Sequence, residues 1–181
     1  DLARLDDGRS ICEVCSTDMI MDSEEAALVY PQVLEFMERT LRLRIPPEMR
    51  SIPILAVDMP TLNEQPRGGG HHSHNVTTRG LCLSEQTMIH HFGRNGMRLQ
   101  TQLAQSTVTA ILVLHQLPRE LFSSILAHEA MHAWLKLSPR LNRRLLPQVT
   151  ALCCLLRGCG WWRTQLTLRQ TMCCLFVQCA T

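Results

Sequence analysis

The sequence His128-Glu129-Ala130-Met131-His132 places two imidazoles one helical turn apart with a carboxylate beside them. Side chains three and four residues apart on a helix lie roughly 5 to 6 Å apart at Cβ, so both histidine Nε2 atoms can reach one tetrahedral ion. This spacing leaves room for a third ligand and a water molecule. We therefore predict that His128 and His132 bind Zn²⁺ and that Glu129 is the general base and acid of a hydrolytic site.

The same residues are also compatible with a structural helix whose polar edge holds no metal. The flanking sequence favours the zinc site, because it is apolar almost without interruption and a buried Glu between two histidines needs a partner. Pro118 suits a first helical position, Glu120 suits the first turn and Ser138-Pro139 ends the segment, which predicts a helix of about 20 residues. The apolar flanking residues are Leu121, Phe122, Ile125, Leu126, Met131, Trp134 and Leu135.

The third zinc ligand is not given by the usual spacings. After His132 the sequence contains no Asp, Glu or His, and Leu135 and Ser138 occupy the third and sixth positions after it. A third protein ligand would have to be a downstream cysteine or an upstream histidine such as His115, since thiolate and imidazole both bind zinc.

The elements before the motif predict a mixed fold. An acidic helix-start signal and helically spaced apolar residues predict a helix over residues 22–46, which Pro31 interrupts or delays. Residues 52–57 and 107–114 are predicted strands, the first at a sheet edge because of its proline, and residues 81–83 predict a short third strand. This pattern predicts an α+β domain whose sheet packs beside the helix that carries the two histidines.

Histidines also occur in two other places. His71, His72 and His74 lie in a Gly- and His-rich stretch, which we interpret as a flexible surface loop rather than a metal site. We interpret His90-His91 in the same way.

Two cysteines near the start have the spacing of half a zinc site. Cys12 and Cys15 form one Cys-x2-Cys knuckle just after a turn signal at Asp6-Asp7-Gly8. The pair matches the closing half of a zinc finger, although single pairs with this spacing also occur in redox sites and by chance. Two thiolates cannot close a tetrahedral structural site, so further ligands are needed.

The composition changes near Val149. Seven of the 18 Lys and Arg residues follow His132, and six of the nine cysteines fall in residues 153–179, beside a Trp-Trp pair. We interpret this shift as a change of reading frame or a retained intron, so residues 150–181 are predicted to be a divergent Cys- and Trp-rich tail. Sequencing the transcript across Val149 tests this hypothesis.

The composition argues against several classes of function. The basic residues are scattered without a basic run or a nucleic-acid motif, and the isoelectric point is about 8.2, so we predict no nucleic-acid partner. No apolar run approaches the roughly 18 residues of a membrane span. The cysteines are expected to be reduced and no targeting signal is present, which predicts the cytoplasm or nucleus. Because the chain begins with Asp, we expect an N-terminal portion to precede it.

Several stretches together match a known family. The chain resembles the DA-one-like family of plant LIM-domain zinc peptidases, which are activated by ubiquitin and regulate organ size. The resemblance covers about residues 1–149. It is carried by Leu5-Asp6-Asp7-Gly8-Arg9 with Cys12 and Cys15, Met21-Asp22, Leu62-Asn63-Glu64, and residues 78–85 (TRGLCLSE), 108–114 (VTAILVL) and 124–135 (SILAHEAMHAWL).

The resemblance implies a zincin-like metallopeptidase core, with the HExxH helix beside a small sheet, preceded by the end of a LIM-type zinc finger. Residues 1–20 would be the LIM remnant, with Cys12 and Cys15 as its last zinc ligands. Residues 21–149 would be a truncated peptidase domain. The family's ubiquitin-interacting segments and first LIM portion are expected before Asp1.

The resemblance also implies where the third peptidase ligand should lie. The family carries it in an acidic stretch directly after a Pro-x-Val, which corresponds to residues 147–149 here. This chain has Thr150-Ala151-Leu152 in place of the acidic stretch. The sequence therefore departs from the family's pattern at the place where its composition changes.

Two functions follow from these observations. The family implies a zinc-dependent endopeptidase under ubiquitin control that cleaves intracellular growth-regulatory proteins, with ubiquitin or ubiquitinated regulators as further partners. The missing downstream ligand favours the alternative, a catalytically impaired isoform that acts as an interaction module or competes for the partners of the full enzyme, because two imidazoles alone should hold zinc weakly.

Overall fold

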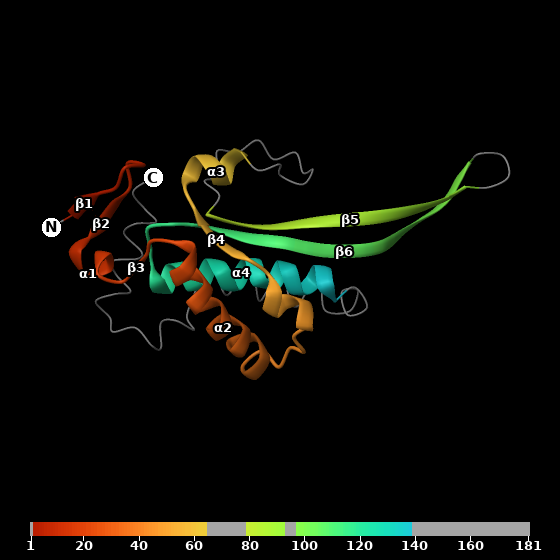
Figure 1. Ribbon diagram of the computed structural model, residues 1–181, viewed down its shortest axis with the longest axis horizontal. Helices are drawn as coiled ribbons and strands as arrows, with labels where there is room; N and C mark the ends of the chain where they lie inside the picture. Colours follow the sequence, from red (N-terminus) through yellow and green to blue (C-terminus); the bar gives the residue numbers. More distant parts are fainter. Residues whose placement is uncertain (1, 65–78, 93–96, 139–181) are drawn as a thin grey trace.

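A computed structural model describes residues 2–64, 79–92 and 97–138 of the chain, and this part mixes helices with small sheets (Figure 1). The predicted α+β class is confirmed. The elements in chain order are β1 (Leu2–Arg4), β2 (Ser10–Cys12), α1 (Glu13–Ser16), β3 (Met19–Ile20), α2 (Ser23–Arg39), the 3-10 helix η1 (Pro47–Ser51), β4 (Ile54–Val57), α3 (Met59–Glu64), β5 (Gly80–Phe92), β6 (Arg98–Leu114), β7 (Leu117–Pro118) and α4 (Arg119–Leu137).

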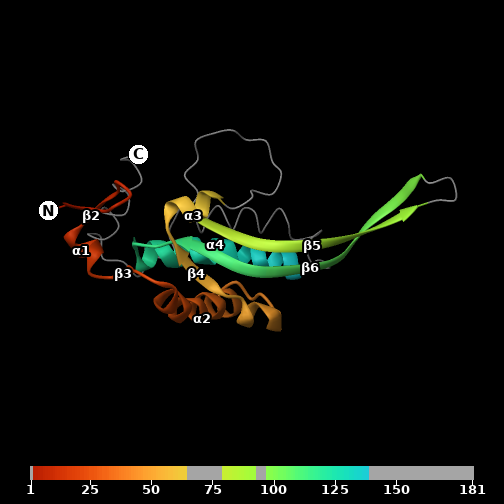
Figure 2. The same cartoon turned by 45° about the horizontal axis from the view of Figure 1, so that its top comes forward.

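The main sheet has three strands in the order β4-β6-β5. β4 runs parallel to β6, with Ile54 opposite Ile111, and β5 runs antiparallel to β6, with Gly80 opposite Val113. The predicted edge position of the first strand is confirmed. Helix α4 packs along β5 and β6, and α2 packs on β4 and on α4, so the two helices lie beside the sheet (Figure 2). The largest fully buried side chains between them include Trp134, Phe122, Met37, Met49, Leu62, Ile111, Leu114, Leu126 and Met131.

Helix α2 begins where its start signal predicts. The carboxylate of Asp22 accepts a hydrogen bond of 2.9 Å from the backbone N–H of Glu25, which satisfies one of the free donors of the first turn. Pro31 lies inside the helix at an exposed position, so it neither interrupts nor delays α2. The buried stripe on the opposite side of the helix holds it against β4 and α4.

The predicted C-terminal end of this helix, at residue 46, is wrong. Helix α2 ends at Arg39, because Arg42 adopts a φ of 55°, which is incompatible with a right-handed helix. The N–H of Leu43 instead bonds to the carbonyl of Met37 at 3.1 Å, which folds the chain back over the end of the helix. The apolar spacing continues past Arg39 because residues of the following loop also contribute to the core.

Strands β5 and β6 are longer than predicted. The sequence predicts strands over residues 81–83 and 107–114, whereas β5 has 13 residues and β6 has 17. Their distal parts form a two-stranded arm that extends beyond the body (Figure 1). The side chains of residues 85–90 are exposed, so pairing with β6 rather than burial forms the strand, and the alternating apolar pattern is missing.

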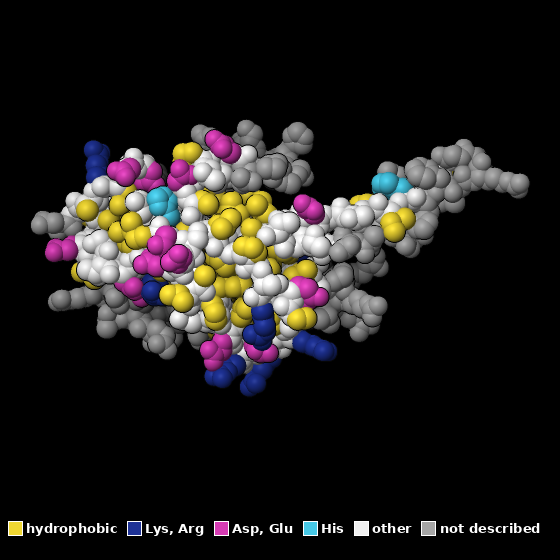
Figure 3. Space-filling view, in the orientation of Figure 1, with side chains coloured by type: hydrophobic (Ala, Val, Ile, Leu, Met, Phe, Trp, Pro, Cys, Tyr) yellow, Lys and Arg dark blue, Asp and Glu magenta, His cyan; other side chains and the backbone are white. Residues whose placement is uncertain are grey.

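The arm carries apolar side chains in contact with solvent. Met88 and Ile89 are 49% and 48% exposed. Hydrophobic side chains along the arm are visible in the space-filling view, where the larger apolar area lies over the body (Figure 3).

Helix α4 lies within one residue of both predicted ends. Pro118 precedes its first residue and Ser138 follows its last. Trp134 is 1% exposed, and its indole N–H donates a 3.0 Å hydrogen bond to the carbonyl of Arg44. The helix is therefore fixed both by its apolar surface and by a polar contact to the loop after α2.

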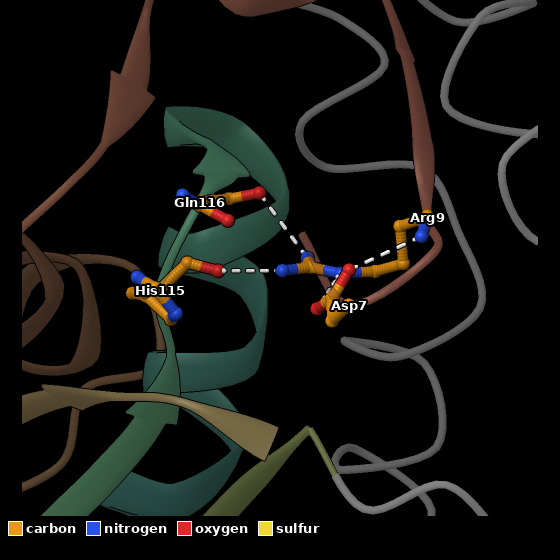
Figure 4. Close-up of polar contacts among 4 residues, drawn as sticks. All are labelled: Asp7, Arg9, His115 and Gln116. Carbon is orange, nitrogen blue, oxygen red and sulfur yellow. Dashed lines mark hydrogen bonds and ion pairs between the residues drawn. The ribbon is translucent and has the colours of Figure 1, made fainter. Parts of the chain in front are cut away.

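Residues 2–20, which we call the N-terminal module, contact the turn at His115 and Gln116, the corner that precedes α4. β3 pairs with β7, and the guanidinium of Arg9 crosses to the same corner (Figure 4). Arg9 Nη1 donates to the carbonyl of Gln116 and Nη2 to the carbonyl of His115, both at 3.2 Å, while Nε pairs with Asp7 at 2.6 Å. The module and the start of α4 therefore share one polar junction.

Candidate active site

Helix α4 brings two histidines together near its middle. The Nε2 atoms of His128 and His132 lie 3.1 Å apart, their ring centroids are 4.7 Å apart and their planes cross at 83°. Both side chains are half-buried. The four-residue spacing places the two rings one above the other on the helix surface. Their role as zinc ligands stays a prediction.

Glu129 points from α4 toward the start of strand β5. It is 6% exposed. A Cβ atom placed on Gly80 would lie 3.0 Å from Glu129 Cγ, 3.1 Å from its Oε1 and 2.6 Å from Ile125 Cγ2, so the main chain of β5 passes directly over this carboxylate. The candidate base is thus held between the helix and the strand.

A second polar contact joins α4 and β5 farther along. Lys136 Nζ donates to the carbonyl of Cys82 at 3.1 Å and lies 3.7 Å from its Sγ. Burial raises the pKa of the Cys82 thiol above its ordinary value of 9.0, the charge of Lys136 opposes this, and the charge of Glu129 adds to it. The buried Cys82 thiol therefore holds its proton more tightly than an exposed cysteine does.

The geometry of the histidine pair fits a zinc ion. Zinc–nitrogen bonds of about 2.0 to 2.1 Å at tetrahedral angles put two ligand nitrogens roughly 3.3 Å apart. The observed 3.1 Å also fits a hydrogen bond between the rings when one Nε2 carries a proton. Within residues 2–64, 79–92 and 97–138, no three His, Cys, Asp or Glu side chains gather closely enough to hold a metal. This part of the chain offers two candidate ligands, and the tail cysteines considered for the third place lie outside it.

The structure does not bring His115 to this pair. His115 lies at the corner before α4, where its carbonyl accepts from Arg9. Its ring charge helps to lower the pKa of Asp58, after the larger effect of the hydrogen bonds from Thr61. His128 lies nine residues into α4, roughly 13 Å along the helix axis. Of the described residues, therefore, none adds a third ligand to the pair.

Cys12 and Cys15 lie together at the start of α1. The N–H of Cys15 donates to Cys12 Sγ at 3.4 Å, which caps the helix, and Cys15 is buried while Cys12 is half-buried. The turn puts both cysteines at one end of the N-terminal module. Their role as zinc ligands stays a prediction.

Of the remaining histidines, the structure describes the side chain of His90 but not that of His91. His90 is exposed on the β5–β6 arm. His71, His72 and His74 lie outside the described residues.

Three contacts at or near the site were not predicted from the sequence. Lys136 lies seven residues after Glu129, and this two-turn spacing could have placed it on the face of α4 that meets the sheet. Gly80 and Arg9 gave no such signal, because each acts across a contact between segments far apart in the sequence.

Comparisons with known proteins give a consistent result. The profile of a family described as DA1-like, Protein DA1, matches residues 41–175. The chain is 38% identical to Protein DA1-related 1 of Arabidopsis thaliana over 174 residues, which cover 89% of this chain and 30% of that protein. It is 39% identical to Protein DA1 of the same plant over 146 residues, covering 74% and 26%. It is 39% identical to LIM domain-containing protein HDR3 of Oryza sativa subsp. japonica over 145 residues, covering 74% and 28%.

The chain thus spans about a quarter to a third of the length of these relatives. No solved structure matches it. Among the described residues, no helix is both long and apolar enough to cross a membrane. The domain boundaries predicted after residues 20 and 149 stay predictions.

Proposed function

The chain belongs to the DA1-like family, and from this premise we propose that it is a zinc-dependent endopeptidase of the ubiquitin-regulated LIM-peptidase type. In this proposal a zincin-like core is formed by α4 and the three-stranded sheet. His128 and His132 hold the zinc ion, and Glu129 is the general base and acid. The substrates are intracellular growth-regulatory proteins, in the cytoplasm or nucleus.

The observation that carries the proposal is the arrangement of three side chains on α4. The two Nε2 atoms lie 3.1 Å apart, close to the roughly 3.3 Å between two nitrogen ligands of one tetrahedral ion, and the buried carboxylate of Glu129 lies between the two histidines in sequence. Buried carboxylates beside possible metal ligands are typical of functional sites, which favours a role for Glu129 in the chemistry.

In the proposed hydrolysis, the zinc ion and the side chains of the protein have different roles. A bound zinc ion supplies a Lewis acid that makes a water molecule acidic and polarises a peptide carbonyl. Glu129 accepts the proton of the attacking water at a carboxylate oxygen and delivers it to the leaving amine. The close cover of β5 over Glu129 excludes bulk water from one side of the carboxylate.

Strand β5 offers a way to hold an extended peptide. Among the described residues, β5 pairs with β6 alone, and Gly80 at its start lies against Glu129. An extended substrate that adds to the other edge of β5 would gain main-chain hydrogen bonds whatever its side chains. Such binding suits an endopeptidase that acts on unfolded segments of proteins.

Cys12 and Cys15 would supply two ligands of a separate, LIM-type zinc ion. The N–H to sulfur bond between them holds the knuckle closed at the end of the N-terminal module. Ubiquitin or ubiquitinated regulators are proposed partners through the family premise alone.

The first experiment measures zinc bound by the purified full chain and by three variants. We expect the variant His128→Ala/His132→Ala to lose about one zinc ion per chain, since two ligands of one tetrahedral site are removed. Glu129→Gln should keep that zinc and lower peptide hydrolysis by about 10²- to 10⁴-fold, the usual contribution of a general base. Glu120→Gln is the matched control, because it makes the same change on the same helix outside the site.

The outcomes separate the two functions. Hydrolysis that survives Glu129→Gln, or that proceeds equally in the double histidine variant, would contradict the proposed mechanism. A parent chain that binds no more zinc than the double histidine variant would contradict the peptidase and favour the alternative, a catalytically impaired module that competes for partners.

A further inference from the structure

Gly80 lies at the point where the edge strand β5 passes over Glu129, the candidate base. A Cβ atom at this position would lie 2.6 Å from Ile125 Cγ2, closer than carbon atoms approach without a shift of one group. It would also lie 3.0 Å from Glu129 Cγ and 3.1 Å from Glu129 Oε1. Every residue other than glycine therefore needs Ile125 or the strand to move, and crowds the carboxylate arm of Glu129.

The strand has little freedom to move away. Gly80 lies opposite Val113 of β6, and the N–H of Leu114, next to Val113, bonds to the carbonyl of Arg79 at 2.9 Å. Two residues after Gly80, the carbonyl of Cys82 accepts the hydrogen bond from Lys136 of α4. The strand is thus held both to β6 and to α4, so the side chains of Ile125 and Glu129 have to take up the added volume.

Displacement of Glu129 matters because its carboxylate can act as a general base only within a small range of positions. The carboxylate lies on α4 one residue from His128 and three from His132, and its Cγ is in contact with the strand. A rotation that carries the carboxylate away from Gly80 changes its distance from the ion that the histidines would hold. A misplacement of about 1 Å in a catalytic group costs on the order of 100-fold in rate.

We propose that Gly80 is a positioning residue of the peptidase site: by lacking a side chain it lets β5 close over α4 and fixes the carboxylate of Glu129 beside the His128–His132 pair. This inference rests on the proposed function. It assigns Gly80 no contact with substrate or zinc. Its effect passes through Glu129, and it predicts a change in turnover rather than in metal binding.

The test compares four full-length chains: the parent, Gly80→Ala, Ile125→Ala and Gly80→Ala/Ile125→Ala. Ile125→Ala removes the 2.6 Å contact, so the double variant keeps the fold even where Gly80→Ala alone does not, while the added methyl group still meets Glu129. The position of Glu129 is read from the ¹³Cδ resonance of its carboxyl group at one fixed pH, assigned by its loss in Glu129→Gln. Zinc affinity, kcat and KM are measured on the same chains.

The expected result has three parts. The Glu129 resonance moves between Ile125→Ala and the double variant. Across the same pair, kcat for peptide hydrolysis falls by about 10- to 100-fold with KM changed by less than about threefold, as for an interaction made in the transition state. Zinc affinity changes by less than about threefold, since neither histidine is touched.

Two results would overturn the inference. One is a Glu129 resonance at the same position in Ile125→Ala and in the double variant. The other is a kcat of the double variant equal to that of Ile125→Ala, which would mean that the methyl group acts on Ile125 alone. A parent chain without Glu129-dependent hydrolysis would instead contradict the proposed function, and the resonance would still decide whether Gly80 positions Glu129.

Discussion

The guanidinium of Arg9 donates a 3.2 Å hydrogen bond to the main-chain carbonyl of His115, although the two residues are 106 positions apart in the sequence (Figure 4). The same side chain reaches the carbonyl of Gln116 and pairs with Asp7. Gln116 has a φ of 53°, so the corner that presents both carbonyls is a left-handed turn. One side chain thus joins the N-terminal module to the turn that leads into α4.

Replacing Arg9 with Lys should destabilise the chain, because an ammonium group cannot donate to two carbonyls and a carboxylate in the geometry of the guanidinium fork. Arg9 is mostly buried, with 14% of its side chain exposed. We expect a loss of about 1 to 3 kcal/mol in the free energy of unfolding, measured by urea denaturation. Arg39→Lys is the control, since its ion pair with Glu35 is 79% exposed on the Arg side and contributes about 0.5 kcal/mol or less. Equal losses in the two variants would show that the fork to the corner carbonyls contributes little.

Replacing Pro31 with Ala should stabilise the chain. Pro31 lies inside α2 and is exposed, so its ring packs on nothing that the change would lose, and it lacks the N–H that would bond to the carbonyl of Ala27. Proline in a helix interior costs about 3 kcal/mol relative to alanine, and we expect Pro31→Ala to recover on the order of 1 to 3 kcal/mol in urea denaturation. Gln32→Ala, at the neighbouring exposed position, should change stability by less than about 0.5 kcal/mol. A Pro31→Ala chain no more stable than Gln32→Ala would mean that α2 has already relaxed around the proline.

The sequence predicted the elements whose signals are local. Helix α4 was found to within one residue because Pro118, a run of apolar residues and Ser138-Pro139 all indicate the same helix. The β5–β6 arm was missed because its strands are paired but exposed, and burial is what produces an alternating pattern. The end of α2 was misplaced because apolar spacing does not reveal the left-handed Arg42.

The residues of the candidate site also differ in whether the sequence could predict them. His128, Glu129 and His132 could be proposed from their spacing on one helix. The contact of Gly80 with Glu129 could not, because it depends on where β5 crosses α4. A glycine gives no signal in one sequence when its role is to leave space for a distant side chain.

Tyr30 should ionise at a higher pH in the folded chain than in the unfolded chain. Burial of its hydroxyl, which donates to the carbonyl of Met49 at 2.9 Å, raises its pKa above the ordinary 10.0, and the charge of Cys82 adds to this. A raised pKa means that the folded state holds the proton more tightly. The corresponding stability is complete below pH 10.0 and is lost as the pH rises toward the folded pKa.

The measurement is direct because Tyr30 is the one tyrosine of the chain. Tyrosinate absorbance, followed against pH in buffer and in concentrated urea, should give a higher midpoint in buffer. Tyr30→Phe should make the unfolding free energy less dependent on pH above pH 10.0, while it loses a hydrogen bond worth about 1 kcal/mol at every pH. Identical midpoints in the folded and unfolded chain would contradict the burial of this hydroxyl.

Replacing His115 with Ala should leave zinc binding at α4 unchanged, whereas His128→Ala should weaken it. His115 lies before α4, beside Asp58 and the Arg9 junction, and of the described residues none completes a group of three ligands with the histidine pair. We expect His115→Ala to change the zinc dissociation constant by less than about twofold and His128→Ala to raise it by at least about tenfold, a difference of roughly 1.4 kcal/mol. Competition with a chelating dye measures both constants on the full chain. A comparable weakening in the two variants would make His115 the third ligand and require the corner before α4 to rearrange when zinc binds. An effect confined to His128→Ala leaves the third place to a residue outside the described part of the chain or to water.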